Sequence, residues 1–291
     1  MKLGVSIQST GLRRDAGLEE RKKYLAGFKD LQEYLKFLKS NGINSIEIRK
    51  YKVQDAFEDF QKAVEAIWEK DMEITIHGEV AGSPSSGKWF SDFYPSLLPI
   101  LEQFGSYQPK LIIPIHAYQS TSLETSVLKE DTINLFNKWI SFIQSEELNV
   151  NFALENNRQK SVNDPCDHLE GVLEIVNEVN SPHLGICWDM GHYRSNLTHD
   201  LKDSKNGNVQ DAFFDKVVHT HIHGLNEQRV THFPIGDHGS LPLEEYVSAL
   251  KRVDYNGVYN LEFSFGRWAE EVDVQRELSR SIERLNHAVE A

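Results

Sequence analysis

Eight short runs of apolar, mostly β-branched residues recur along this chain, separated by longer segments with the period of an amphipathic helix. Apolar runs of this length are typical of buried β-strands. Strands that strictly alternate with helices pair in parallel through right-handed crossovers, and eight such units close into a barrel more readily than they form an open sheet. The predicted strands are Leu3–Ile7, Ser45–Arg49, Glu73–His77, Leu111–His116, Asn149–Glu155, Gly185–Asp189, Val217–His223 and Val258–Phe263.

The segments between these runs predict helices. In the clearest of them, Leu31, Leu35 and Leu38 share one face, and Gly42 stands where a helix C-cap glycine is expected. The segment after the sixth strand is the weakest, because only Ala212–Phe214 in it is clearly apolar. The predicted helices are Phe28–Gly42 and Ala56–Lys70, with others at about Tyr94–Phe104, Val127–Ser145, His168–Val179, Leu243–Val253 and Ala269–Val289.

The chain length and the absence of an internal linker favour one domain. A chain of 291 residues lies within the range of a single α/β barrel, and its 40% hydrophobic content is ordinary for a globular protein. We therefore expect an α/β fold, a single (β/α)8 TIM barrel with parallel strands, over residues 1–291. A doubly wound sheet is the alternative, but no GxGxxG follows the first strand.

The net charge, the cysteine content and the lack of long apolar runs indicate which kinds of partner and cellular location to expect. The 31 Lys and Arg against 44 Asp and Glu give a net charge of −13, which disfavours nucleic acid as a partner and favours a small, diffusible substrate. Cys166 and Cys187 do not suggest a disulfide framework. The sequence shows neither a secretory h-region nor a run of ~18 apolar residues, so we expect no membrane partner and a cytoplasmic location.

Six consecutive predicted strands end in a carboxylate or an imidazole. Active sites of such barrels gather where the carboxyl ends of the strands meet. Carboxylates and imidazoles are the ligands that Zn²⁺, Mn²⁺ and related ions accept, and a buried ring of carboxylates without a cation would be costly. The pattern therefore predicts a divalent-metal site. The residues are His77, His116, Glu155, Asp189 with His192, His221 with His223, and Glu262.

Each of these residues also has a simpler interpretation when it is taken alone. A single His at a strand end, such as His77 or His116, is more often hydrogen-bonded structure than a ligand. Asp189 could serve as a helix N-cap. His219 lies one layer deeper in the barrel than His221 and is interpreted as structural, whereas the role of His223 stays open.

Four segments carry a joint pattern: Asn151–Asn156 (NFALEN), Leu184–His192 (LGICWDMGH), His219–His223 and Asn260–Ser264. Together they resemble a known family, the xylose-isomerase-like barrels, which include sugar isomerases, sugar epimerases and the endonuclease IV group of nucleases. The resemblance covers essentially the whole chain and is sharpest from Leu111 to Phe263.

Carried over by position, the resemblance to the epimerase branch implies a metal centre. Glu155, Asp189, His221 and Glu262 would hold one Mn²⁺, Mg²⁺, Co²⁺ or Zn²⁺ ion. Glu155 and Glu262 would also be the catalytic residues, moving protons on opposite faces of a sugar or sugar phosphate through an enediolate.

The nuclease branch supplies the alternative. His77, His116, His192 and His232 match the additional histidines that help to hold three zinc ions there. The nuclease pattern has an Asp two residues before the last of these histidines, and this chain has Val230 at that position. The four histidines could bind a second metal ion, or they could contact the hydroxyl and phosphate groups of a sugar.

The sequence supports three candidate functions, in the following order. A metal-dependent sugar isomerase or epimerase comes first, a multi-zinc phosphodiester hydrolase of the endonuclease IV type second, and a binding module last. Arg49 and Arg158 could hold a substrate carboxylate or phosphate, although an ion pair at the rim of the site is the preferred interpretation for both. A homo-oligomer stays open, because nothing in the sequence marks an interface.

Overall fold

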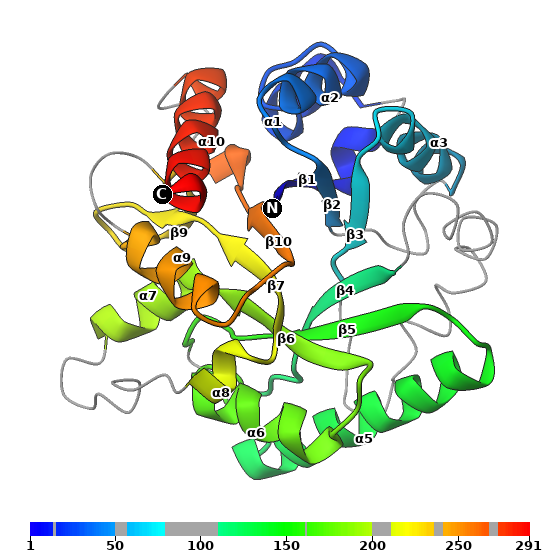
Figure 1. Ribbon diagram of the computed structural model, residues 1–291, viewed down its shortest axis with the longest axis vertical. Coiled ribbons are helices and arrows are strands. Elements are labelled where there is room, and N and C mark those ends of the chain that lie inside the picture. The colour runs from blue at the N-terminus through cyan, green and yellow to red at the C-terminus, as the bar shows by residue number, and fades with distance from the viewer. Residues whose placement is uncertain are drawn as a thin grey trace. The chain divides into compact units, whose positions relative to one another are not determined.

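The computed structural model describes residues 1–13, 16–49, 57–78, 110–160, 162–199, 211–235, 241–267 and 273–291. Eight parallel strands close into a barrel in the neighbour order β1, β2, β3, β4, β5, β6, β7, β10, so the predicted fold class is confirmed (Figure 1). The strands are β1 Lys2–Gln8, β2 Ser45–Arg49, β3 Glu73–Ile76, β4 Leu111–His116, β5 Val150–Glu155, β6 Leu184–Asp189, β7 Val217–Ile222 and β10 Val258–Leu261. A short hairpin of β8 (Gly224–Leu225) and β9 (Thr231–Phe233) lies between β7 and β10 in sequence.

The helices follow the predicted segments where the apolar period is strong. Helix α2 starts after Asp30, whose side chain accepts from the backbone N–H of Glu33, and Gly42 follows it at φ +84°, as expected for a C-cap glycine. The described helices are α1 Leu18–Tyr24, α2 Leu31–Ser40, α3 Phe57–Trp68, α5 Thr125–Ser145, α6 Leu169–Val179, α7 Met190–His199, α8 Asp211–Phe214, α9 Leu243–Lys251 and α10 Val274–Glu290, with 3-10 turns η1 Ser9–Leu12 and η2 Phe265–Arg267.

Some elements depart from the sequence-based prediction. The apolar periodicity of the sequence did not predict α1, α7 or the β8–β9 hairpin. Helix α7 has a polar sequence without a clear apolar stripe, and it begins because the side chain of Asp189 caps it. The helix predicted at about Tyr94–Phe104 lies outside the described residues.

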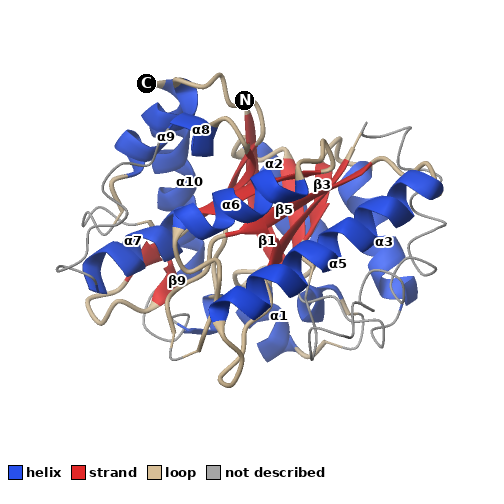
Figure 2. Ribbon diagram, turned by 90° about the horizontal axis from the view of Figure 1, so that it is seen from below, coloured by secondary structure: helices blue, strands red, loops and turns tan. Residues whose placement is uncertain are grey.

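The chain divides into two compact units, which are described separately. Unit 1 comprises Met1–His77 and His221–Ala291, and unit 2 comprises Gly78–Thr220. In unit 1, β1 pairs with β2 and β10, and β2 pairs with β3. In unit 2, β5 pairs with β4 and β6, while α6 packs on β5 and β6 and α5 packs on α6 (Figure 2). The expectation of one domain over residues 1–291 stays a prediction.

Unit 2 illustrates why these strands are apolar along their whole length. Every residue of β5 and β6 is buried, as expected for parallel strands that are covered on both faces. Phe152 of β5 packs against Phe136 and Trp139 of α5, with ring centroids 5.8 and 5.2 Å away. Cys166 and Cys187 are both buried and are not joined by a disulfide. No helix among the described residues is long and apolar enough to cross a membrane.

Candidate metal centre

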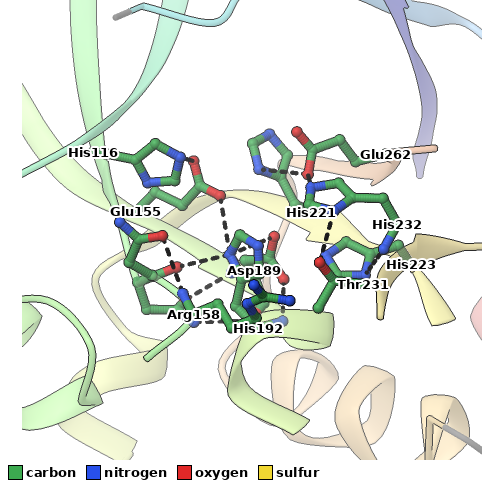
Figure 3. A network of polar contacts seen from close by, with 12 residues as sticks. His116, Glu155, Arg158, Asp189, His192, His221, His223, Thr231, His232 and Glu262 are labelled. Carbon is green, nitrogen blue, oxygen red and sulfur yellow. Dashed lines mark hydrogen bonds and ion pairs between the residues drawn. The ribbon is translucent and has the colours of Figure 1, made fainter. Parts of the chain in front are cut away.

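The predicted site residues are buried or half-buried, and each unit holds its own network of them (Figure 3). Because parallel strands carry these residues at or near their carboxyl ends, side chains from neighbouring strands come together within each unit. Unit 2 contributes His116, Glu155, Asp189 and His192, and unit 1 contributes His77, His221, His223, His232 and Glu262, together with Glu47 and Arg49.

Glu155 ends β5 in unit 2, and its side chain is fully buried. The register of the parallel pair β4–β5 sets His116 directly beside it. One carboxylate oxygen lies 3.5 Å from Nε2 of His116, and the other lies 3.7 Å from Nδ1 of His192. The structure therefore brings two of the four additional histidines to this glutamate.

Asp189 is the last residue of β6, and it also caps α7. Its Oδ1 accepts from the backbone N–H of His192 at 2.6 Å, while Oδ2 lies 3.1 Å from Nδ1 of the same residue. The N-cap interpretation is thus confirmed, and it leaves Oδ2 directed at an imidazole. Asn156 fixes the backbone of Asp189 from both sides, because its amide donates to the carbonyl at 2.9 Å and accepts from the N–H at 2.7 Å.

A second layer of polar side chains lies behind these residues. Asp164 is buried and accepts from Asn157 Nδ2 and from the backbone N–H of Cys166, both at 2.8 Å. Burial raises the pKa of Asp164 to about 6, although these two hydrogen bonds act in the opposite direction. This unit therefore contains a carboxyl group that titrates close to neutral pH.

Glu262 follows β10 in unit 1, and its carboxylate forms an ion pair with the permanently charged guanidinium of Arg49. Its Oε1 lies 2.6 Å from Nη2 of Arg49, while Oε2 lies 3.3 Å from Nε2 of His232 and 3.6 Å from Nδ1 of His221. Burial by itself would raise the pKa of the Glu262 carboxyl, but the Arg49 guanidinium holds it well below its usual range. Arg49 therefore forms an ion pair, as preferred from the sequence, but the pair is buried and does not lie at the rim.

His221 is fully buried between two carboxylates. Its Nε2 lies 2.9 Å from Oε2 of Glu47, and its Nδ1 faces Glu262. The ring of His77 stacks on it, with centroids 5.4 Å apart and planes inclined by 14°. His77 therefore lies beside a predicted ligand, as the strand-end pattern led us to expect.

His223 and His232 form a stacked pair with ring centroids 4.3 Å apart. The backbone N–H of His232 donates to Nδ1 of His223 at 3.0 Å, and Nδ1 of His232 lies 2.9 Å from the hydroxyl of Thr231. Burial, together with the neighbouring His223, lowers the pKa of His232 to about 3. The ring of His232 is therefore neutral near pH 7, which is the form that can ligate a metal ion.

Two residues that support these networks, one in each unit, were not predicted from the strand ends. Glu47 lies in the middle of β2, and Asn156 comes just after β5. A signal for Glu47 was present, because a Glu inside an apolar strand is seldom buried without a specific partner. The backbone N–H of Arg158 donates to Oδ1 of Asn157 at 3.0 Å, but its guanidinium forms no ion pair with a residue in the described ranges. Its assignment to a substrate or to an ion pair stays a prediction.

The donor atoms fit a divalent cation. They are buried carboxylate oxygens and imidazole nitrogens, which Zn²⁺ and Mn²⁺ both accept. The clearest sign is Oε2 of Glu262, which is buried and accepts no well-directed hydrogen bond from any residue in the described ranges. A buried carboxylate oxygen in this situation is costly unless a cation meets it.

Two curated proteins match part of the chain. An uncharacterized protein of Methanocaldococcus jannaschii, MJ1311, is 30% identical over 95 residues, which are 32% of this chain. A probable endonuclease 4 of Mesomycoplasma hyopneumoniae is 25% identical over 197 residues, which are 64% of this chain. The matches span 30% and 66% of the lengths of these two relatives, respectively.

Solved structures match over almost the entire chain. A D-psicose 3-epimerase has a TM-score of 0.69 at 11% identity, covering all of both chains. A D-tagatose 3-epimerase-like protein has a TM-score of 0.65 at 17% identity, covering 99% of this chain and 100% of the other. An IOLI protein with a bound zinc atom has a TM-score of 0.61 at 16% identity, covering 99% and 98%. At these identities the likeness is one of fold.

The family is given by the sequence match together with the closed barrel of parallel strands. The matching family model extends over residues 35–285, from α2 to α10, and so includes every predicted site residue. The chain belongs to the xylose isomerase-like TIM barrel family.

Proposed function

We propose that this chain is a divalent-metal-dependent isomerase or epimerase of a sugar or sugar phosphate, acting as one domain over residues 1–291. The observation that carries the proposal is the burial of carboxylates and imidazoles at or next to the ends of β5, β6, β7 and β10, which are successive neighbours in the barrel. The epimerase neighbours of the fold support the same class of reaction.

Four residues would hold the metal ion: Glu155, Asp189, His221 and Glu262. In a closed parallel barrel, the carboxyl ends of the strands point to one end of the barrel, so side chains from four successive strands can reach one ion. Two observations support this set. Oε2 of Glu262 accepts no well-directed hydrogen bond from a described residue, and the fixed backbone of Asp189 holds its carboxylate in place.

The chemistry would be a proton transfer at the carbon next to a carbonyl group. A divalent ion in this position would polarise the carbonyl and hydroxyl oxygens of the substrate, which acidifies that carbon. Glu155 and Glu262 would then act on opposite faces: one removes the proton to give the enediolate, and the other returns a proton to the opposite face or to the neighbouring carbon. The chain's net charge of −13 favours a small substrate of this kind over a nucleic acid.

The direct test is a screen of keto sugars and their phosphates with Mn²⁺, Mg²⁺, Co²⁺ and Zn²⁺ supplied separately, combined with metal analysis of protein purified without chelator. We expect about one ion per chain, isomerase or epimerase turnover with at least one keto sugar, and loss of turnover on chelation. Incorporation of solvent deuterium at the reacting carbon would identify the proton transfer. Turnover that survives complete removal of metal would disprove the proposal.

A second candidate is a phosphodiester hydrolase with two or more zinc ions. Its specific support is the placement of the extra histidines, since His116 and His192 flank Glu155 while His232 lies beside Glu262. Several ions held in this way could activate water and neutralise the leaving oxygen together. The match to a probable endonuclease 4 points in the same direction.

Metal stoichiometry and substrate class separate the two candidates. The hydrolase requires two or more ions per chain and cleavage of phosphate diesters or abasic DNA in the same metal series. The isomerase requires one ion and turnover of keto sugars without release of phosphate. A His232→Ala variant that retains its metal and most of its activity would favour the isomerase.

A further inference from the structure

The second carboxylate beside His221 comes from Glu47 in β2, within unit 1. Its side chain is fully buried, and both of its oxygens are engaged. Oε1 accepts from the hydroxyl of Ser6 at 2.8 Å, and Oε2 lies 2.9 Å from Nε2 of His221. A buried carboxylate needs partners that compensate for its loss of hydration, and the His221 ring is one of the partners of Glu47.

The contact with Glu47 decides which nitrogen of His221 carries a proton. An ionised carboxylate can only accept hydrogen bonds, so Nε2 of His221 is the protonated atom and donates to Glu47. In the neutral ring, Nδ1 then carries a lone pair, and it faces Oε2 of Glu262 across 3.6 Å. Two acceptor atoms that face each other at this distance repel, and a shared cation removes the repulsion.

We propose that Glu47 is a positioning residue of the metal centre: it fixes the tautomer and the orientation of His221 so that Nδ1 is the metal-binding atom. This inference deepens the proposed function and rests on it. Metal-binding histidines commonly donate their other ring N–H to a carboxylate, which increases the basicity of the ligand and fixes the ring. Glu47 itself would not contact the ion.

A chain of contacts behind Glu47 holds it in place. Ser6 lies opposite Glu47 in the register of β1 and β2, and its hydroxyl accepts from Nδ2 of Asn260 at 2.9 Å. Asn260 lies opposite Gly4 in the register of β1 and β10, and a Cβ added at Gly4 would come within 2.7 Å of Asn260 Oδ1. The glycine therefore leaves the room that Asn260 needs, and three strands contribute to the support of one imidazole.

A plain buried ion pair is the competing explanation. In that case His221 would be doubly protonated, with one N–H directed to Glu47 and the other to Glu262. The two explanations differ in metal affinity and in the protonation of His221 in the metal-free protein. Both quantities can be measured without any assay of turnover.

The main experiment compares Co²⁺ affinity and the visible Co²⁺ spectrum of the wild type, Glu47→Gln and Glu73→Gln. The last variant is a matched control, because Glu73 begins the adjacent strand β3 and pairs with Lys2. We expect Glu47→Gln to bind Co²⁺ about 10- to 100-fold more weakly and to shift its absorption bands, while Glu73→Gln matches the wild type. Equal affinity and equal spectra in Glu47→Gln and wild type would overturn the inference.

Two further measurements keep the test decisive. Nitrogen NMR of the metal-free wild type should show a neutral His221 that is protonated on Nε2, and a proton on Nδ1 would overturn the proposal. If Glu47→Gln does not fold, Ser6→Ala takes its place, with the same expected direction and a smaller loss of affinity. A wild type that binds no divalent ion would instead disprove the proposed function, so the two failures are distinguishable.

Discussion

The buried carboxylates of the two units lie beside different kinds of charged or ionisable side chains. In unit 1, Glu262 meets the permanent charge of Arg49 at 2.6 Å. In unit 2, the described contacts of Glu155 and Asp189 include imidazoles, which carry a charge only when they are protonated. A guanidinium cannot give up its proton, whereas an imidazole can exchange its proton for a metal ion or pass it on. Glu262 in unit 1 thus lies beside both a permanent charge and two imidazoles, whereas Glu155 and Asp189 in unit 2 lie beside imidazoles.

This difference leads us to propose unequal roles for the two glutamates. The Arg49 guanidinium keeps the pKa of Glu262 well below its usual range, which suits a metal ligand. Glu155 lies between two imidazoles that could pass on a proton, so we propose it as the principal base of the proposed reaction.

The largest expected effect comes from replacing these glutamates. Glu155→Gln and Glu262→Gln keep the shape of the side chain but remove a carboxylate that would bind the metal ion and transfer a proton, so turnover should fall by about 10²- to 10⁴-fold in each. Glu262→Gln should also lower the melting temperature more than Glu155→Gln, because it leaves Arg49 buried without its carboxylate. Steady-state kinetics and thermal unfolding would measure both effects. Normal turnover in either variant would rule out the proton-transfer mechanism.

The next expected effect is on the free energy of unfolding, and it tests the ion pair between Arg49 and Glu262 in unit 1. Arg49→Met removes the cation and leaves Glu262 buried, which should lower the free energy of unfolding of the metal-free protein by about 3–5 kcal/mol. Adding Glu262→Gln in the same chain should recover much of this loss. Lys2→Met is the control, because its pair with Glu73 is partly exposed and should contribute at most about 1 kcal/mol. Similar losses in the two single variants would contradict the role given to Arg49.

A third test uses pH to probe unit 2. The pKa of Asp164 is about 6 in the folded protein, above the ordinary value of 3.8, so the folded state binds the proton more tightly. The resulting stabilisation is complete below about pH 3.8 and is lost as pH rises through about 6, in total about 3 kcal/mol. Asp164→Asn should therefore flatten the decline of unfolding free energy between pH 4 and 7 in urea titrations. Parallel curves for the variant and the wild type would show that Asp164 titrates normally.

The smallest expected effect is on metal affinity, and it tests the side-chain amide of Asn156 in unit 2. Asn156→Ala removes both hydrogen bonds to the backbone of Asp189, so divalent-metal affinity should fall about tenfold. Asn151→Ala in β5 is the matched control: its amide donates to the carbonyl of Pro182, and its loss should leave metal affinity unchanged. Calorimetric titration with Mn²⁺ would compare the two. A loss in both variants would indicate a general weakening of β5 instead.

The sequence predicted the barrel because its strands and most of its helices carry strong periodic patterns. It did not predict α7, since that helix begins at a side-chain cap on Asp189 and not at an apolar stripe. Strand ends led to the predicted ligands, whereas Glu47 was missed because it lies within β2. Its pairing with Ser6 depends on the register of two strands, which sequence patterns do not specify.

Gly4 shows how far the influence of such a centre can extend. It is not itself a predicted ligand, yet any side chain placed there would collide with Asn260 Oδ1 and with Val258 Cγ1, each at 2.7 Å. In a deep mutational scan, this position near the start of the chain would therefore score as intolerant, much like a residue of the active site. Intolerance at such a buried glycine would report on the alignment of an imidazole two strands away, and it should not be interpreted as substrate contact.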